Sequence, residues 1–241
     1  MIDNEATGGR RMNICKWMVA ALLLVGLEQA HATEPVDDLL REASDLDADP
    51  GRGRTLYLEH CVACHGRQGQ GDAKRKIPVI AHQRQAYIVK QFADIREAER
   101  DAPPMHAVMS RPELRNVQAW VDVAIHVNNL PAITEVETGD GKYLSLGEAT
   151  FRQHCASCHG KDARGDDDGF VPSLRNQHYS YLLDALQTLG AGHRANVEPD
   201  LIRLLQSFGS DEQVGLADYL SRLRGKTRDL TWLRPNGAAG D

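Results

Sequence analysis

Aromatic side chains are scarce in this chain. Phe, Trp and Tyr make up 5% of its 241 residues, so the apolar core is thin for the length. A large flat cofactor buried in each domain would supply the missing apolar surface. The length itself exceeds the usual single domain and favours two domains of about 100 residues each.

An excess of positive charge is also absent. The formal net charge is -6, and the 28 Lys and Arg residues are scattered along the chain. A protein that binds nucleic acid needs a basic face to neutralise phosphates, so the composition argues against nucleic acid as a partner. Strand-like alternation of apolar and polar residues is missing as well, which favours an all-α fold.

Long hydrophobic runs are lacking. The apolar run 17–27 covers about half of the roughly 20 residues that a membrane-spanning helix needs. Three basic residues precede it, and Ala30-His31-Ala32 follows it as a small-residue cleavage site, so residues 1–32 are predicted to be a secretory signal peptide. The mature protein is then expected in the periplasm. The alternative is a membrane anchor.

Cysteine is limited to five residues. Cys15 lies before the apolar run and is given no role in the mature protein. The other four form two pairs, Cys61 with Cys64 and Cys155 with Cys158. In an oxidising compartment four cysteines would ordinarily suggest two disulfides, but a histidine follows each pair at once.

These two motifs belong to an internal repeat. The segments CVACHG and CASCHG are offset by 94 residues, and the same offset holds well beyond them. After Arg194, the second copy is expected to be longer by about five residues. The offset then becomes 99, and Trp120 falls opposite Tyr219. Further pairs at the offset of 94 are Gly53 and Gly147, Tyr57 and Phe151, Pro78 and Pro172, Gln83 and Gln177, Tyr87 and Tyr181, and Arg100 and Arg194.

The repeat predicts two domains with one layout. Each copy has a short helix entering the cysteine motif, a Gly/Asp-rich loop, a middle helix, a variable loop and a last amphipathic helix. Ser110 and Glu113 form a capping-box pattern that predicts where the last helix of the first copy begins, and Ser210 begins the corresponding segment of the second copy. The predicted boundaries are 33–132 for domain 1, 133–143 for the linker, 144–226 for domain 2 and 227–241 for a C-terminal tail.

The Cys-x-x-Cys-His pattern suits one task in particular. Two thiols three positions apart bond to the vinyl groups of a haem, while the imidazole that follows reaches the iron. Structural zinc would need four ligands around one metal, whereas these motifs lie 94 residues apart, and a thioredoxin-like redox pair would need a βαβ context. Two covalently attached haem c groups are therefore predicted.

The chain resembles class I cytochromes c, and specifically the two-domain cytochrome c4 family. The resemblance implies an all-α fold of two class I cytochrome c domains in tandem, each wrapped around one haem. It also implies that a glycine lets the first and last helices of each domain cross closely, with aromatic residues packed at the crossing. It rests, over roughly residues 49–225, on CVACH and CASCH, Gly53-xxx-Tyr57, Gly147-xxx-Phe151, the Gln83/Tyr87 and Gln177/Tyr181 pairs, Trp120 and Tyr219.

The resemblance also implies the iron ligands. His65 and His159 follow as the proximal ligands, and the family places a distal methionine on the loop before the last helix. In the first copy Met105 is preferred, because it follows the turn formed by residues 102–104. Met109 is the alternative, otherwise an apolar residue packed against the last helix.

The second copy departs from the family pattern. No methionine occurs after residue 109, and the offset of 99 places Leu204 opposite Met105. His193, in the expected enlarged loop, is the first candidate for the distal ligand of haem 2, and His178 is the second. An open or water-bound iron is the remaining alternative.

The predicted function is electron transfer between redox protein partners, without enzymatic activity of its own. A respiratory oxidase, a reductase and a dehydrogenase all remain open as partners, and association with a membrane complex is left open too. The alternative is that haem 2 is open or weakly ligated and serves ligand binding, sensing or catalysis within an oxidoreductase complex. Arg100 and Arg194 are candidates to face the haem propionates.

Overall fold

The computed structural model describes residues 36–225, and these lie within one compact unit. The predicted signal peptide, Cys15 and the predicted C-terminal tail lie outside the described residues. Over this range the chain folds into helices joined by loops, and the only β-pairing described consists of three isolated bridges. The all-α prediction is confirmed. No helix within 36–225 is long and apolar enough to cross a membrane.

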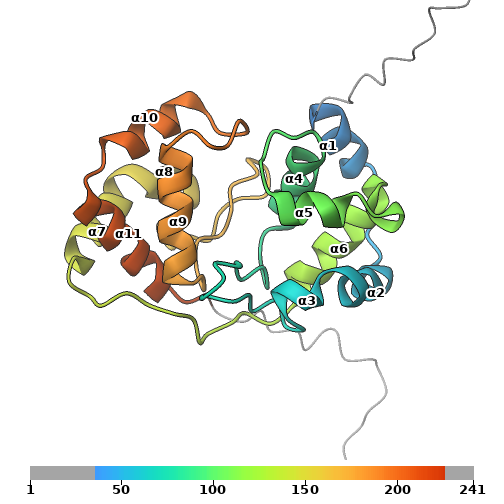
Figure 1. Cartoon of the computed structure of the whole chain (residues 1–241), viewed down its shortest axis with the longest axis horizontal. Coiled ribbons are helices and arrows are strands. Elements are labelled where there is room, and N and C mark those ends of the chain that lie inside the picture. Colours follow the sequence, from blue (N-terminus) through green and yellow to red (C-terminus); the bar gives the residue numbers. More distant parts are fainter. Residues whose placement is uncertain (1–35, 226–241) are drawn as a thin grey trace, which may run out of the picture. The chain divides into compact units, whose positions relative to one another are not determined.

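The first copy runs from blue to green in Figure 1 and follows a preceding helix, α1. Its entry helix α2 and last helix α6 pack against each other, and α4 packs on α6. The core between them is closed by fully buried side chains such as Tyr57 and Trp120. The elements are α1 (Val36–Ser44), α2 (Pro50–His60), α3 (Val62–His65), α4 (Gln85–Arg96), α5 (Pro103–Met109), the 3₁₀ turn η2 (Pro112–Leu114) and α6 (Val117–Asn129).

Helix α1 has no counterpart in the repeat and was not predicted. It is amphipathic: Val36 and Leu39 are buried against the first copy, while Asp37 and Asp38 are exposed in its first turn. Acidic residues at a helix N-terminus interact favourably with the helix dipole. The helix therefore contacts α4 and α6 through its apolar side and leaves its acidic residues on the surface.

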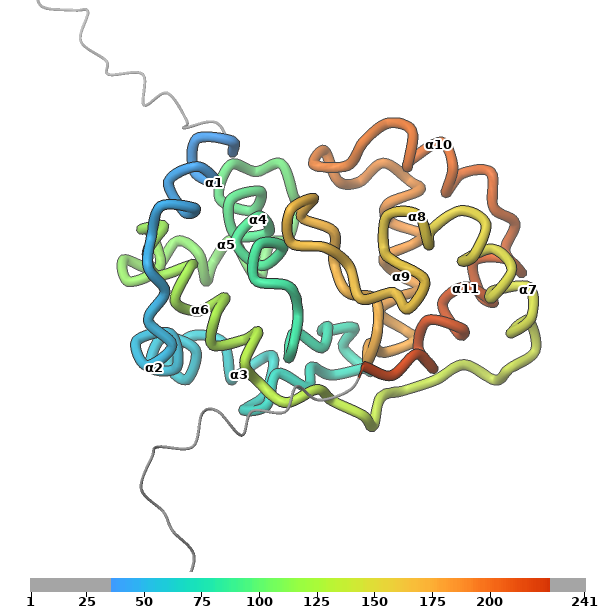
Figure 2. Tube along the Cα trace, turned by 180° about the vertical axis from the view of Figure 1, so that it is seen from behind, coloured from blue at the N-terminus to red at the C-terminus, as the bar shows by residue number. Residues whose placement is uncertain are grey.

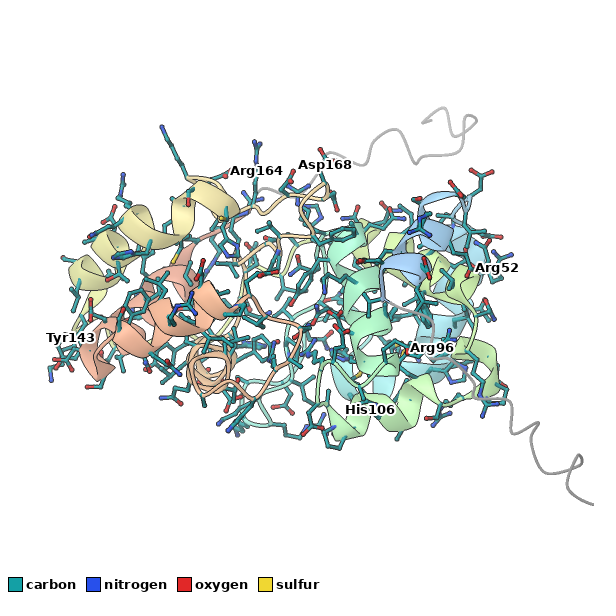
Figure 3. The ribbon with its side chains drawn as sticks, turned by 90° about the horizontal axis from the view of Figure 1, so that it is seen from above. Arg52, Arg96, His106, Tyr143, Arg164 and Asp168 are labelled. Atoms are coloured by element: carbon teal, nitrogen blue, oxygen red, sulfur yellow. The ribbon has the colours of Figure 1, made fainter. Side chains whose placement is uncertain are left out.

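The second copy repeats this order, from yellow to red along the tube of Figure 2. Its entry helix α7 packs against α11, and α9 packs on α11 and α10. The smaller core of this copy is centred on Phe151, Leu216 and Leu220. The elements are α7 (Leu144–Thr150), the π-helical turn η3 (Phe151–Cys155), α8 (Ala156–His159), α9 (Tyr179–Gly190), α10 (Pro199–Ser207) and α11 (Ser210–Arg222).

The first and last helices of each copy cross so closely that only glycine fits. A Cβ on Gly53 would lie 1.9 Å from the carbonyl oxygen of Asp122, and a Cβ on Gly147 would lie 1.8 Å from that of Gly215. Both distances are far inside van der Waals contact, so the backbones themselves would have to separate. This is the close crossing that the resemblance implied.

The last helix of the first copy begins later than predicted. Ser110 follows the end of α5, and α6 begins at Val117, where the Asn116 side chain accepts a hydrogen bond from the Ala119 N–H at 2.8 Å. Asn116 is an equally good N-cap residue, and the 3₁₀ turn of η2 occupies the intervening chain. In the second copy α11 does begin at Ser210, as predicted, with Glu212 accepting from the Gly209 N–H.

This difference corrects the predicted offset. Helices α6 and α11 are equally long and begin 93 residues apart, rather than 99. The ring of Tyr57 faces His126 at a centroid distance of 5.2 Å, and the ring of Phe151 faces Tyr219 at 5.6 Å. Tyr219 is therefore the counterpart of His126, not of Trp120.

Trp120 instead packs in the core of the first copy. Its ring lies edge-on to Phe92, and its Nε1–H donates to the Leu114 carbonyl at 2.6 Å. The expectation of an aromatic residue at the helix crossing is thus met by Tyr219 in the second copy, whereas an imidazole takes that place in the first. The second copy is not enlarged by five residues before its last helix.

Candidate haem sites

The cysteine motif of the first copy lies at the end of α2. Asp49 caps the start of that helix by accepting hydrogen bonds from the Gly51 and Arg52 N–H groups, and the helix breaks at Cys61 before the single turn of α3. Gly66 ends the turn with φ +76°, a conformation that favours glycine. The motif is thereby held as one compact turn.

The histidine of this motif is buried and fixed through one ring nitrogen. His65 Nδ1–H donates to the Pro78 carbonyl oxygen at 3.2 Å. A neutral imidazole that donates through Nδ1 has Nε2 as its remaining lone-pair nitrogen. His65 is therefore prepared to coordinate a metal through Nε2.

The second copy reproduces this arrangement on a different local backbone. Here the entry helix α7 passes into the π-helical turn Phe151–Cys155 before α8. A π turn differs from the surrounding α-helix in that its backbone hydrogen bonds join residues five apart instead of four. His159 Nδ1–H donates to the Pro172 carbonyl oxygen at 3.0 Å, which matches the first copy.

Burial sets the protonation states of both motifs. Desolvation lowers the pKa of His65 and of His159 below the usual value, which favours the neutral imidazole that a metal requires. Desolvation also raises the pKa of the Cys61 thiol to about 12 and that of Cys155 to about 11. These two sulfurs are therefore thiols rather than metal-binding thiolates.

A clustered metal site is excluded within residues 36–225. No group of three or more His, Cys, Asp and Glu side chains there could hold a metal ion, and no disulfide joins the four cysteines. Two neutral histidines, His65 buried and His159 half-buried, each with a free Nε2 and a neighbouring pair of thiols, are the donors that a covalently attached haem uses. The residues present fit the group that the motifs predict.

Two arginines, one from each copy, lie side by side where the two copies meet. The backbones of Arg100 and Arg194 pair in an isolated antiparallel bridge. Arg100 Nε is buried with no hydrogen-bond partner among the described residues. Burial raises the pKa of Tyr181, but the charges of the two arginines outweigh it and lower that pKa overall. A buried guanidinium with one unpaired N–H suits a carboxylate such as a haem propionate.

Both candidate distal methionines of the first copy lie on α5. Pro103 and Pro104 occupy the first turn of this seven-residue helix, where proline is well tolerated. Met105 is half-buried and packs against the core, while Met109 at the end of the helix is buried. The structure thus places the preferred ligand Met105 at the edge of the core and the alternative Met109 within it.

In the second copy, α10 is the helix that precedes the last helix. This helix has the sequence PDLIRLLQS and contains no methionine, histidine or cysteine. Because the offset of 99 does not hold at the last helix, Leu204 is no longer the defined counterpart of Met105. In any register, however, α10 offers neither a thioether nor an imidazole to an iron.

Comparisons with known proteins agree with this geometry. The family model described as "Cytochrome c" matches residues 144–220, and the model described as "Cytochrome C oxidase, cbb3-type, subunit III" matches residues 48–121. Each match contains one Cys-x-x-Cys-His motif. The chain is 27% identical over 190 residues to cytochrome c4 of Pseudomonas aeruginosa, which covers 75% of this chain and 84% of the relative.

The chain is a di-haem class I cytochrome c. It resembles the cytochrome c4 family, and it carries two covalent haem c groups, for which the Cys61/Cys64 and Cys155/Cys158 pairs fit as attachment sites. The crystal structure of reduced recombinant cytochrome c4 from Pseudomonas stutzeri shares the fold with a TM-score of 0.65 at 24% identity, covering 74% of this chain and all of that chain.

A second group of relatives consists of subunits of cbb3-type cytochrome c oxidases. The chain is 24% identical over 180 residues to the cbb3-type cytochrome c oxidase subunit FixP of Sinorhizobium medicae, covering 70% of this chain and 56% of the relative. It therefore spans little more than half the length of that subunit. Both groups of relatives support electron transfer as the function of this cytochrome.

The two candidate histidines of the second copy differ in their surroundings. His178 is buried, its Nε2–H donates to the Gln70 carbonyl at 2.9 Å, and its Nδ1 accepts from the Glu137 N–H. Both ring nitrogens are used, so His178 holds the two copies and the linker together instead of reaching a haem iron. His193 lies on the exposed loop between α9 and α10, and its backbone N–H donates to the Thr188 carbonyl.

Sequence reasoning missed two functional contacts at the boundary between the copies. Gln83 and Gln177 were noted as a repeated pair, yet their role was not assigned. In the structure each reaches across to the other copy and binds the backbone just after the proline that holds the proximal histidine. The signal was present in the shared offset of Pro78 with Pro172 and Gln83 with Gln177, but the repeat does not say which copy a side chain contacts.

Proposed function

We propose that this cytochrome is an exported, periplasmic electron carrier that passes electrons between redox protein partners. Its iron ligands would be His65 and Met105 for haem 1, and His159 for haem 2. The observation that carries the proposal is the matched pair of proximal sites, in which each histidine is neutral and anchored through Nδ1 to a proline carbonyl. When bound, each haem supplies a one-electron ferric/ferrous couple.

The role of the protein is to set the two potentials. A thioether ligand beside an imidazole raises the reduction potential, and only the first copy offers one. Haem 2 would therefore have the lower potential if His193 completes its coordination. The difference between the two potentials would give electron transfer a direction.

The charge distribution supports a partner with a basic docking face. Residues 34–49 contain seven Asp or Glu and a single Arg, and Asp37 and Asp38 of α1 are exposed. Opposite charges on two proteins increase their encounter rate, and salt screens this effect. A respiratory oxidase, a reductase and a dehydrogenase all fit such an encounter, whether free or within a membrane complex, and the FixP relative favours an oxidase.

A second candidate function follows from α10. If His193 does not reach the iron, haem 2 is five-coordinate and can bind a small ligand, which would suit sensing or catalysis within an oxidoreductase complex. The observation that favours this candidate is the absence of any thioether or imidazole on α10, together with the exposed position of His193.

One experiment tests the proposal and separates the two candidates. The full chain is expressed in a host that matures c-type cytochromes, the cells are fractionated, and the haem-stained product is examined by visible spectroscopy with and without carbon monoxide. We expect a periplasmic product with two haems that stay low-spin and ignore carbon monoxide. Carbon monoxide binding to half of the haem would favour the second candidate. A product without covalent haem, or one retained in the cytoplasm, would overturn the proposal.

A further inference from the structure

Two glutamines bridge the copies in a reciprocal way. Gln177 Oε1 accepts from the Val79 N–H at 2.9 Å, and its Nε2–H donates to the Val79 carbonyl at 2.8 Å. Ninety-four residues earlier, Gln83 Oε1 accepts from the Ser173 N–H at 2.8 Å, and its Nε2–H donates to the Ser173 carbonyl at 3.0 Å. Each glutamine therefore binds, with both ends of its amide, one backbone residue of the opposite copy.

The peptide that each glutamine binds is the one that orients a proximal histidine. The Pro78 carbonyl, which accepts from His65 Nδ1–H, and the Val79 N–H are the two polar ends of a single peptide group. In the second copy, the Pro172 carbonyl and the Ser173 N–H stand in the same relation to His159 and Gln83. A continuous chain of hydrogen bonds thus links each proximal imidazole to a glutamine from the other copy.

Peptide resonance makes this chain cooperative. When the N–H of a peptide donates to an acceptor, its carbonyl oxygen gains negative charge and becomes a better acceptor in turn. A stronger acceptor at Nδ1–H increases electron donation from the imidazole to a bound metal. Donation of this kind stabilises the ferric state and lowers the potential of the haem.

We propose that Gln177 lowers the reduction potential of haem 1 and that Gln83 lowers that of haem 2, each from the opposite copy and through the proximal peptide. The inference rests on the proposed ligation of the two irons by His65 and His159. Both glutamines are positioning residues, since neither touches a haem ligand itself. Packing of the two copies against each other thereby lowers the reduction potentials of both haems. This effect needs no direct contact between the haems.

Burial makes the two effects unequal. Gln177 is 6% exposed and Val79 is 5% exposed, whereas Gln83 and Ser173 are only half-buried. Hydrogen bonds are electrostatically stronger where water is excluded. The shift from removing Gln177 should therefore exceed the shift from removing Gln83.

The test replaces each glutamine with methionine, which keeps the length of the side chain and removes its hydrogen bonds. The potentials of both haems are measured by spectroelectrochemical titration of the mature full-length holoprotein. We expect Gln177→Met to favour the ferrous state of haem 1 by up to about tenfold in the reduction equilibrium, and Gln83→Met to do the same for haem 2 to a smaller extent. The Met-ligand absorption, present for haem 1, identifies which titration step belongs to which haem.

Two further variants separate tuning from packing. Ser180→Ala removes another hydrogen bond between the copies, from Ser180 Oγ to the Ala73 carbonyl at 2.9 Å, which lies outside both proximal peptides; it should leave both potentials unchanged. Gln177→Glu keeps an acceptor for the Val79 N–H and should return the potential of haem 1 to the original value or below it.

The direction of the shift decides the outcome. Loosened docking would admit water, which favours the more highly charged ferric state and lowers both potentials, the opposite of the expected rise. A fall in both potentials, a shift in the haem of the glutamine's own copy, or no shift at all would overturn this inference while two haem titration steps persist. A wild-type protein without two such steps would instead refute the proposed function.

Discussion

The two copies of this cytochrome agree on their proximal sides and differ on their distal sides. Both hold a histidine against a proline carbonyl, although one reaches it through a plain helix end and the other through a π-helical turn. The distal helices α5 and α10 share only a proline-led start. Covalent haem attachment demands one proximal geometry, whereas the distal ligand can change without unfolding the domain.

The helix crossings show the same contrast between a fixed and a variable part. Gly53 and Gly147 are required in both copies, because each lies against a backbone carbonyl. The aromatic position opposite them is His126 in the first copy and Tyr219 in the second. Steric exclusion at the crossing is therefore conserved between the copies, while the chemistry of the adjacent contact has diverged.

The largest expected effect comes from adding a methyl group at the crossings. Gly53→Ala and Gly147→Ala should each destabilise the holoprotein by about 3 kcal/mol or more, since the new Cβ would overlap a carbonyl group. Because reciprocal hydrogen bonds join the copies, both variants should unfold in one transition with a lowered midpoint, measured by thermal denaturation.

The matched control is Gly51→Ala, whose Cβ would meet only the Asp49 side chain at 3.2 Å. It should change stability by less than about 1 kcal/mol. Separate unfolding steps for the two copies in Gly53→Ala would contradict the coupling between them.

Met105→Leu should have a smaller effect on stability. It should nevertheless change the visible absorption of one haem completely. This replacement makes the distal side of the first copy like that of the second. The Met-ligand absorption near the red end of the visible spectrum should disappear for one haem, and the potential of that haem should fall. The change in side-chain volume is small and should cost less than about 1.5 kcal/mol of packing.

Met109→Leu is the control on the same helix, because Met109 is buried in the core. Its absorption spectrum should match that of the unaltered protein. Loss of the band in Met109→Leu, with retention in Met105→Leu, would assign the ligand to Met109.

The smallest effect concerns the pH dependence of the first copy. Burial lowers the pKa of His126, with a further contribution from Arg54. The folded state therefore binds fewer protons than the unfolded state, and stability is lost as the pH falls through the unfolded value of about 6.5 towards the lower folded value. His126→Phe keeps a ring against Tyr57 and should reduce this loss.

The check is the free energy of unfolding of His126→Phe and of the unaltered protein, from about pH 7.5 to about pH 5.5. The half-exposed position of His126 limits the difference to less than about 1 kcal/mol. Tyr219→Phe, the matched change in the second copy, removes a hydroxyl and should leave the pH dependence unaltered. An equal loss in His126→Phe and in the unaltered protein would show that other groups cause the acid sensitivity.

Much of the fold followed from the sequence because the repeat is long and its motifs have one chemical use. The motifs around His65 and His159 indicated two haems, and the glycines at 53 and 147 indicated the close helix crossings. Element boundaries were less certain. Ser110 and Asn116 are both good N-cap residues, and the choice between them depended on how η2 and Trp120 pack rather than on local preference.

Helix α1 and the counterpart of Tyr219 could not be predicted for related reasons. Helix α1 lies outside the repeat, and its amphipathic pattern becomes meaningful only when Val36 and Leu39 have a surface to cover. The offset is 93 at the last helices because different segments precede them: α5 and η2 in the first copy, and α10 in the second. A sequence alignment sees only the residues, whereas the ring contacts of His126 and Tyr219 fix the register.

The sequence by itself determined the cofactor chemistry of this protein, since covalent attachment depends on residues that are adjacent in the chain. Tertiary structure alone decided what lies between the copies. His178 remained a candidate ligand until both of its ring nitrogens were seen to be occupied, and Gln83 and Gln177 had no assigned partner until the opposite backbone was in place. Hydrogen bonds between residues about 90 to 108 positions apart depend on how the two copies pack together, and no local pattern in the chain encodes that packing.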